Sequence, residues 1–413
     1  MNRFSFLMLL FTAASIQAQE KTDRSFEALI RKNASSFLKN VLDKKDSFQY
    51  QVIYTEIKRD AHQRPSFINH YLNVDRNRYF NPASTVKMPV AFTALEKLNG
   101  LKGRINAQMA MITDSSYSGQ SAVTSDSTAA NGLPSIEHYI KKIFIVSDND
   151  AYNRLYEFTG QQYLNESLWE KGYKDIRITR RFVPMNEEEN RHTNQLRFFN
   201  NGKLVYTQPP AYSRVLFHFP KNKILVGTGH WDKNDSLIHE PMDFTTHNNL
   251  PLEDGNLLLR SVLFPQSVPE KSRFHLTKEQ YNLLYTYLSE LPYESRYPRY
   301  DTTEFFDSYT KFFFFRAGKE KIPGYIRVFN KAGWSYGYLT DYCYVVDFKN
   351  NVEFMLSATI YVNSDGILND DKYDYETIGF PFFKEIGTII YNYELNKKRS
   401  IIPDLSNWKK TYR

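Results

Sequence analysis

NPASTVKMPVAFTALEKLNG, residues 81–100, predicts a helix with a defined start and end. Pro82 suits the first helical position, and Gly100 suits the end of the helix. Lys87 follows Ser84 by three positions, so both side chains lie on one face of that helix. Ser84 also falls in the first turn, near the positive end of the helix dipole. The segment therefore predicts a serine hydroxyl with a lysine amine beside it.

A serine and a lysine at this spacing can act as a nucleophile and its base. The hydroxyl is a weak nucleophile until a base takes its proton, and lysine serves only where burial or a nearby cation favours the neutral amine. The pattern is weak by itself, because Ser-x-x-Lys also begins at Ser36, Ser308 and Ser406, and a solvated helix face also explains such a pair. Ser84 stands out because an apolar stretch follows it, which would bury its helix and leave its N-terminus facing a cleft.

Two further motifs each occur once in the chain. Ser-Asp-Asn occupies 147–149, and Lys-Ala-Gly occupies 331–333. Taken singly, each has an ordinary alternative. The first could cap a helix or form a polar turn, and the second could be a surface lysine before a bulge glycine.

Together, the three motifs follow the order found in the penicillin-recognising serine enzymes. The chain resembles the class A β-lactamases and related penicillin-binding proteins. The distance from Ser84 to Ser147 is close to the usual one in that family, and KAGWSYGYLTDYCYVVD resembles the hairpin that carries its third motif. The resemblance covers essentially the mature chain apart from its middle.

The resemblance implies roles for the matched residues. Ser84 would attack the carbonyl and carry the acyl group, Lys87 would accept or relay the proton, and Ser147 would return a proton to the leaving nitrogen. Lys331 would keep this region electropositive and attract a substrate carboxylate. Ser84, Lys87, Ser147 and Lys331 are therefore the candidate catalytic residues.

The substrate-binding residues implied by the resemblance are Asn149, Gly333 and Trp334. Asn149 would bind the substrate's side-chain amide or Lys87. The backbone N–H groups of Ser84 and Trp334 would form the oxyanion hole, since acyl transfer needs fixed donors for the developing negative charge.

The third motif departs from the family pattern. Ala332 stands where a hydroxyl residue usually helps to bind the β-lactam carboxylate, and Ser335 is a possible replacement. Trp334 keeps its backbone donor but brings a bulky ring, which we expect beside the cleft.

A second departure concerns release of the acyl group. Class A β-lactamases activate water with a glutamate in a Glu-x-x-x-Asn arrangement. The equivalent region, 180–194, offers Glu187, Glu188 and Glu189, but none has an asparagine four positions later. Either one of them activates water or the run is a solvated loop. Without a placed base the acyl-enzyme would hydrolyse slowly, as in a penicillin-binding protein.

The periodicity predicts an α+β fold of the β-lactamase type. We expect helices at 24–43 and 380–395, strands at 47–57 and 66–74, and three successive strands within 325–362. Strands from both ends of the chain would form one antiparallel five-stranded sheet, flanked by the terminal helices and joined to a helical lobe. A hairpin at 195–208 opens a β-rich middle, so residues 19–413 would form one domain with an insertion at about 195–275.

The N-terminus predicts export. A short positive start and an apolar run from Phe4 to Ile16 match a secretory signal peptide over 1–18. The run is short for a spanning helix, although a retained anchor is the alternative. We expect a periplasmic or secreted protein with no integral membrane segment after cleavage. Cys343 is the only cysteine, so no intrachain disulfide is possible and a buried thiol is expected.

Composition limits the partners. The net charge of +7 is spread among acidic residues rather than clustered, which argues against nucleic acid. The nine histidines are dispersed and no His-Glu-x-x-His occurs, so we expect no metal and no cofactor. A monomer acting on a small β-lactam or a peptidoglycan-derived substrate is the prediction.

These observations predict an exported serine hydrolase that forms an acyl-enzyme, with β-lactam hydrolysis as the expected activity. The same residues could serve a D,D-peptidase acting on peptidoglycan. Ala332 and Trp334 also allow a binding protein that kept the fold and lost turnover.

Overall fold

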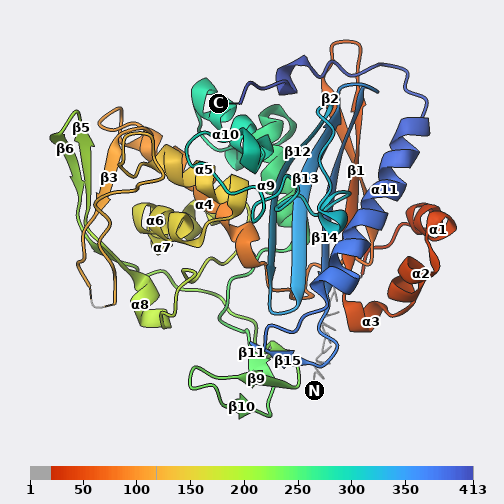
Figure 1. The fold of residues 1–413 in the computed structure, drawn as a ribbon, viewed down its shortest axis with the longest axis horizontal. Helices are drawn as coiled ribbons and strands as arrows, with labels where there is room; N and C mark the ends of the chain where they lie inside the picture. The colour runs from red at the N-terminus through yellow and green to blue at the C-terminus, as the bar shows by residue number, and fades with distance from the viewer. Residues whose placement is uncertain (1–19, 118, 413) are drawn as a thin grey trace, which may run out of the picture.

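A five-stranded antiparallel sheet forms the centre of the molecule (Figure 1). The computed structural model describes residues 20–117 and 119–412, so the predicted signal peptide lies outside the described residues. The strand order is β12-β13-β14-β1-β2, which places strands from both ends of the chain side by side. Their bounds are β1 Gln51–Arg59, β2 Pro65–Leu72, β12 Ile326–Ser335, β13 Tyr338–Asp347 and β14 Val352–Tyr361. The predicted α+β fold with a five-stranded antiparallel sheet is confirmed.

The two strands nearest the predicted site are joined by a tight turn. Ser335 pairs with Tyr338, and the two residues between them, Tyr336 and Gly337, have φ angles of 52° and 80°. Two positive φ values in a two-residue loop are those of a type I′ turn, whose twist matches that of the strands. This turn fixes the register of β12, which is an edge strand of the sheet.

Helices from both ends of the chain cover one face of the sheet (Figure 1). They are α1 (Arg24–Asn33), α2 (Ser36–Asp43), α3 (Lys45–Phe48) and α11 (Phe380–Asn396). The segment predicted as one helix at 24–43 is two helices. Ser35 interrupts it, because its hydroxyl accepts the N–H of Leu38 and so caps α2.

The opposite face is covered by two helices of the middle region and by the helical lobe. These elements are α4 (Lys87–Gly100), α5 (Ile136–Val146), α6 (Asn149–Thr159), α7 (Gln161–Glu170), α9 (Leu252–Leu263) and α10 (Lys278–Ser289). Helix α4 is buried almost all round, as expected of a helix inside a core. The 3₁₀ turn η1 (Ala83–Val86) leads into it.

The middle of the chain holds short strands followed by a core helix. The short helix α8 is Glu187–Arg191. The short strands of the middle are β4 (His192–Thr193), β5 (Leu196–Asn200), β6 (Lys203–Gln208), β7 (Ala211–Tyr212), β8 (Leu225–Val226), β9 (Gly229–Trp231), β10 (Leu237–Ile238) and β11 (Met242–Asp243). Two short strands from other parts of the chain, β3 (Ala110–Thr113) and β15 (Ile367–Leu368), pair with β5 and β9. The predicted hairpin at 195–208 is present, with its turn at Asn201-Gly202. The short strands of this middle region end with β11 at Asp243, and α9 then contacts the main sheet. The β-rich part is therefore shorter than the predicted 195–275.

Six further one-turn 3₁₀ or π elements connect these parts: η2 (Pro265–Ser267), η3 (Glu270–Ser272), η4 (Pro292–Glu294), η5 (Arg316–Gly318), η6 (Tyr375–Gly379) and η7 (Ser406–Trp408). Within the described residues, none of the helices combines the length and apolar character that crossing a membrane requires.

Candidate active site

Ser84 lies at the start of a strained turn. Ala83, the residue before it, has a φ of 46°, a conformation that a residue with a Cβ adopts only at a cost. The turn η1 then runs directly into α4, so Ser84 is held at the helix entrance, half-buried between the sheet and the helical lobe. Backbone strain of this kind gathers at functional positions, which gives Ser84 support independent of its motif.

Lys87 is completely buried one turn further along. Its Nζ donates to the carbonyl oxygen of Ser147 at 2.5 Å and to Oδ1 of Asn149 at 2.6 Å, and lies 3.3 Å from the Ser147 hydroxyl. Burial lowers the pKa of Lys87 well below its ordinary value, and the positive charge of Lys331 lowers it further. A lowered pKa favours the neutral amine, which is the form that a general base requires.

One residue of the 147–149 motif caps a helix, and the other two contact Lys87. Asp148 caps α6, because its carboxylate accepts the N–H of Ala151 at 2.7 Å. Ser147 ends α5 in the left-handed region with a φ of 62° and directs both its oxygens at Lys87. The capping interpretation therefore holds for the central residue, while its two neighbours contact the lysine.

Lys331 reaches the same hydroxyl from the sheet. Its Nζ donates to Oγ of Ser147 at 2.9 Å and to its neighbour's carbonyl oxygen at 2.5 Å. Burial lowers its pKa to about 7, with Asp341 acting in the opposite direction. Lys87, Ser147, Asn149 and Lys331 thus form one hydrogen-bonded cluster beside Ser84.

A second buried lysine lies behind Lys331. Lys311 donates to Oδ1 of Asn330 at 2.6 Å, and Asn330 donates to the Asp341 carboxylate at 2.8 Å. Burial raises the pKa of Asp341 to about 7 and lowers that of Lys311 to about 7. In the sequence, Lys311 stands out only as part of the Ser308-x-x-Lys pattern, and its place in this group was not predicted.

Gly333 is required by the close approach of β12 to the nucleophile turn. A Cβ on Gly333 would lie 2.5 Å from the backbone nitrogen of Ser84 and 2.9 Å from that of Thr85. Real Cβ atoms do not come so close, so only glycine lets this edge strand lie against η1. The glycine of the third motif is therefore a packing requirement of the site.

The alternate residues of β12 face away from the cluster. Ala332 is buried in the core beneath the terminal helices, and the Trp334 ring packs there against Phe312 and Tyr309, at 5.7 and 5.8 Å between ring centroids. This follows from the alternation of side chains along a strand, with Lys331 and Gly333 on the site face. The expectation that the Trp334 ring lies beside the cleft is wrong.

The first turn of helix α8 contains Glu187, Glu188 and Glu189. Asn186 and Glu189 form a reciprocal capping box, while Glu187 and Glu188 are exposed. The Lys87 amine contacts none of the three carboxylates.

The side chain that covers Lys87 from this loop is aromatic. The Phe182 ring centroid lies 4.8 Å from Lys87 Nζ, and the Phe182 N–H donates to Oδ1 of Asn153 at 2.9 Å. Asn186 follows Phe182 by four positions, the spacing of the family's Glu-x-x-x-Asn arrangement. The chain therefore has phenylalanine where that arrangement would place the water-activating glutamate, a substitution that a search for acidic residues missed.

A cavity of about 650 Å³ adjoins this cluster. Asn81 and Asn149 line it on the site side, and Ser335 and Tyr336 line it from the hairpin. Most of the rest of its wall comes from the 180–185 loop and from the segment predicted as an insertion, including Trp231, Lys233, His247 and Asn248. The segment predicted as an insertion therefore helps to build a cavity that reaches Asn149, although Ser84 itself does not line it.

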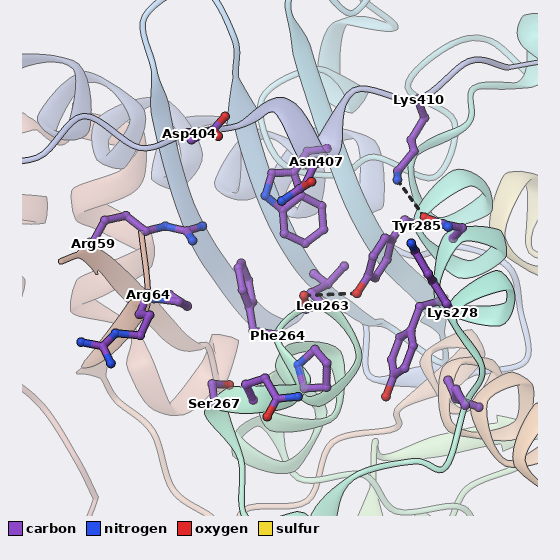
Figure 2. A pocket seen from close by; sticks show the side chains of 17 residues that line it. Arg59, Arg64, Leu263, Phe264, Ser267, Lys278, Tyr285, Asp404, Asn407 and Lys410 are labelled. Carbon is purple, nitrogen blue, oxygen red and sulfur yellow. Dashed lines mark hydrogen bonds between the residues drawn. The ribbon is translucent and has the colours of Figure 1, made fainter. Parts of the chain in front are cut away.

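A larger cavity, of about 840 Å³, lies elsewhere (Figure 2). Its wall includes Arg59, Phe264, Tyr285 and Lys410, and Tyr285 donates to the carbonyl oxygen of Leu263 at 3.5 Å. None of the motif residues lines it. Size alone therefore does not locate the site.

A model of one enzyme family matches part of the chain. Residues 33–224 match the β-lactamase enzyme family. This range includes Ser84, Lys87 and the 147–149 motif and ends before Lys331. No curated protein sequence matches the chain.

Several solved structures are similar in fold. A β-lactamase from Burkholderia vietnamiensis is 12% identical, with 91% of this chain and 98% of that one covered and a TM-score of 0.48. A β-lactamase from Xanthomonas campestris pv. campestris is 14% identical, with 89% and 98% covered and a TM-score of 0.47. A mutant of PBP-A, in an acyl-enzyme complex with penicillin G, is 12% identical, with 89% and 97% covered and a TM-score of 0.46.

Proposed function

Because residues 33–224 match the β-lactamase enzyme family, we propose that the chain is a serine hydrolase of the β-lactamase and penicillin-binding-protein superfamily, which forms an acyl-enzyme on Ser84 and releases the acyl group slowly. The observation that carries this proposal is the environment of Lys87. Its buried amine binds Ser147 and Asn149 on one side, and the Phe182 ring covers it on another. The contacts with Ser147 and Asn149 suit acylation of Ser84. The Phe182 ring, in contrast, offers no carboxylate that could activate water for hydrolysis of the acyl-enzyme.

Acylation follows from the cluster as a sequence of proton transfers. The Ser84 oxygen attacks the carbonyl carbon of a strained or peptide amide while its proton passes to the neutral Lys87 amine. As the carbon–nitrogen bond breaks, the Ser147 hydroxyl gives a proton to the leaving nitrogen and is reprotonated from Lys87. Lys331, bound to the same hydroxyl, stabilises its transient negative charge and attracts a substrate carboxylate.

Deacylation needs a base that removes a proton from water, and a positioned base contributes roughly 10²–10⁴-fold. In the described part of the chain, Lys87 forms no hydrogen bond or ion pair with a carboxylate. We therefore favour the penicillin-binding or D,D-peptidase alternative over rapid β-lactam hydrolysis. The signal-like N-terminus supports export to the compartment where peptidoglycan is found, and a single-chain enzyme suffices for this chemistry.

A fluorescent penicillin tests the nucleophile. We expect covalent labelling of the wild type and none of Ser84→Ala. Ser406→Ala is the matched control, because Ser406 begins another Ser-x-x-Lys pattern and is exposed. Unchanged labelling of Ser84→Ala, or no labelling of the wild type, would refute the proposal.

A chromogenic cephalosporin tests the slow release. The expected trace is a burst of about one equivalent followed by a much slower steady rate. Rapid turnover without a burst would instead support the β-lactamase alternative.

A further inference from the structure

Arg180 is a partly buried cation that lines the cavity next to the candidate site. Its Nη1 lies 2.9 Å from Nε2 of His247, and its Nε is buried without a hydrogen bond. No ion pair to Arg180 occurs among residues 20–117 and 119–412. Its neighbour Arg181, by contrast, pairs with the buried Glu157 at 2.8 Å. Unpaired guanidinium groups are costly to bury, so this one calls for a functional reason.

The insertion holds Arg180 in place. Oδ1 of Asn248 accepts the N–H groups of Thr179 and Arg180, at 2.7 and 3.2 Å, and the Tyr152 hydroxyl donates to the Arg180 carbonyl oxygen at 2.8 Å. Burial lowers the pKa of His247 to about 3, so its imidazole stays neutral and can accept the guanidinium N–H. The side chain is thus oriented by a neutral group that leaves its charge uncompensated.

Arg180 lines a cavity on the side of the site that would hold the acyl group of a bound substrate. Arg180, His247 and Asn149 line the same cavity. Asn149 is bonded to Lys87, and the family resemblance gives it the amide of the substrate's acyl side chain. The cavity therefore adjoins the side of the site that would hold the acyl group, and Ser147, which would protonate the leaving nitrogen, does not line it.

The acidic groups nearby are engaged or solvated. Asp232 and Asp235 lie at the tip of the β9–β10 hairpin, where the Asp232 carboxylate accepts the N–H groups of Asn234 and Ser236. Asp235 and Glu187 are exposed. None of these carboxylates pairs with Arg180, which leaves its free donors to a ligand.

We propose that Arg180 selects acyl donors that carry a carboxylate on their acyl portion, such as a peptide with an acidic side chain. This inference rests on the acyl-enzyme function proposed above and names its substrate class. Arginine suits the task because its planar fork donates two parallel hydrogen bonds to a carboxylate. The insertion thereby acts in substrate selection, since two of its residues, His247 and Asn248, place the guanidinium.

Two penicillins that differ by one group test the inference. Carbenicillin is benzylpenicillin with an added carboxylate on the acyl side chain. Second-order rates of Ser84 acylation by each are measured by competition with a fluorescent penicillin. The ratio of the carbenicillin rate to the benzylpenicillin rate is compared among the wild type, Arg180→Gln and Arg180→Lys. Arg177→Gln is the matched control, because Arg177 also has an unpartnered Nε but does not line the cavity.

In Arg180→Gln we expect the ratio to fall by about tenfold, because a glutamine amide can replace at most one of the two hydrogen bonds to the carboxylate and carries no charge. Arg180→Lys should keep part of the preference, and Arg177→Gln all of it. Acylation by benzylpenicillin should change little, which separates this inference from the proposed function. An unchanged ratio in Arg180→Gln overturns the inference alone. Failure of both penicillins to acylate the wild type overturns the proposed function and this inference with it.

Discussion

Phe182→Glu should shorten the lifetime of the penicilloyl adduct on Ser84 by roughly 10²-fold, the lower end of what a positioned general base contributes. The magnitude follows from the position of Phe182. Its ring centroid is 4.8 Å from Lys87 Nζ, and its backbone is fixed by Asn153, so a carboxylate there would lie beside the lysine at the family spacing from Asn186. The lower end applies because the loop has not been shaped around a catalytic water.

The same substitution should have two costs. A carboxylate beside Lys87 favours the protonated amine, so acylation should slow several-fold while deacylation accelerates. The half-buried Phe182 ring also packs against Tyr152 at 4.8 Å between centroids, and its loss should reduce the free energy of unfolding by about 1–2 kcal/mol.

The assay follows decay of a preformed adduct. Enzyme labelled with a fluorescent penicillin is freed of excess reagent, and the remaining label is measured over time. Phe182→Gln is the matched control, because glutamine has nearly the same size as glutamate and lacks its charge. If Phe182→Glu folds and is labelled but loses its adduct no faster than Phe182→Gln, a missing carboxylate does not limit deacylation.

Three further outcomes are expected. Gly333→Ala should place a Cβ against the Ser84 backbone, lower the unfolding free energy by about 1–3 kcal/mol and reduce labelling far more than stability, as melting curves and labelling rates would show. Glu188→Gln should leave the adduct lifetime unchanged, and a slower decay would return this exposed carboxylate to the mechanism. Burial lowers the pKa of Lys87, so its neutral form should be reached at a lower pH than for an ordinary lysine, and the acylation rate should rise with that form. The rate should then fall as pH rises through the pKa of Lys331, about 7, because its positive charge is lost; a pH–rate profile that rises up to pH 10 would contradict this.

The parts of the fold set by local signals could be predicted from the sequence. The Thr277 side chain caps α10, and the three strands predicted within 325–362 are β12, β13 and β14. Both depend on neighbouring residues, through capping and side-chain alternation. The break between α1 and α2 was missed, because helical periodicity continues across Ser35 while its side chain caps a new helix.

The site could be predicted only where a motif names its residues. Lys87, Ser147 and Lys331 were found by their motifs and spacing. Their buried neighbours Lys311 and Asp341 come together through tertiary packing, which no local pattern encodes. The Trp334 ring was misplaced because its motif was considered without the alternation along β12, which directs the ring into the opposite core.

The two halves of the proposed reaction depend on different kinds of structure. The acylation residues come from η1, the α5–α6 junction and an edge strand, which are fixed by strain, capping and the close contact at Gly333. Deacylation and acyl-group selection depend instead on one short loop, which carries Arg180 and Phe182 and is tied to the rest by Asn248 and Asn153. A change at Phe182 can therefore alter how long the acyl group stays, and a change at Arg180 which acyl group enters, while the nucleophile and its proton path remain intact.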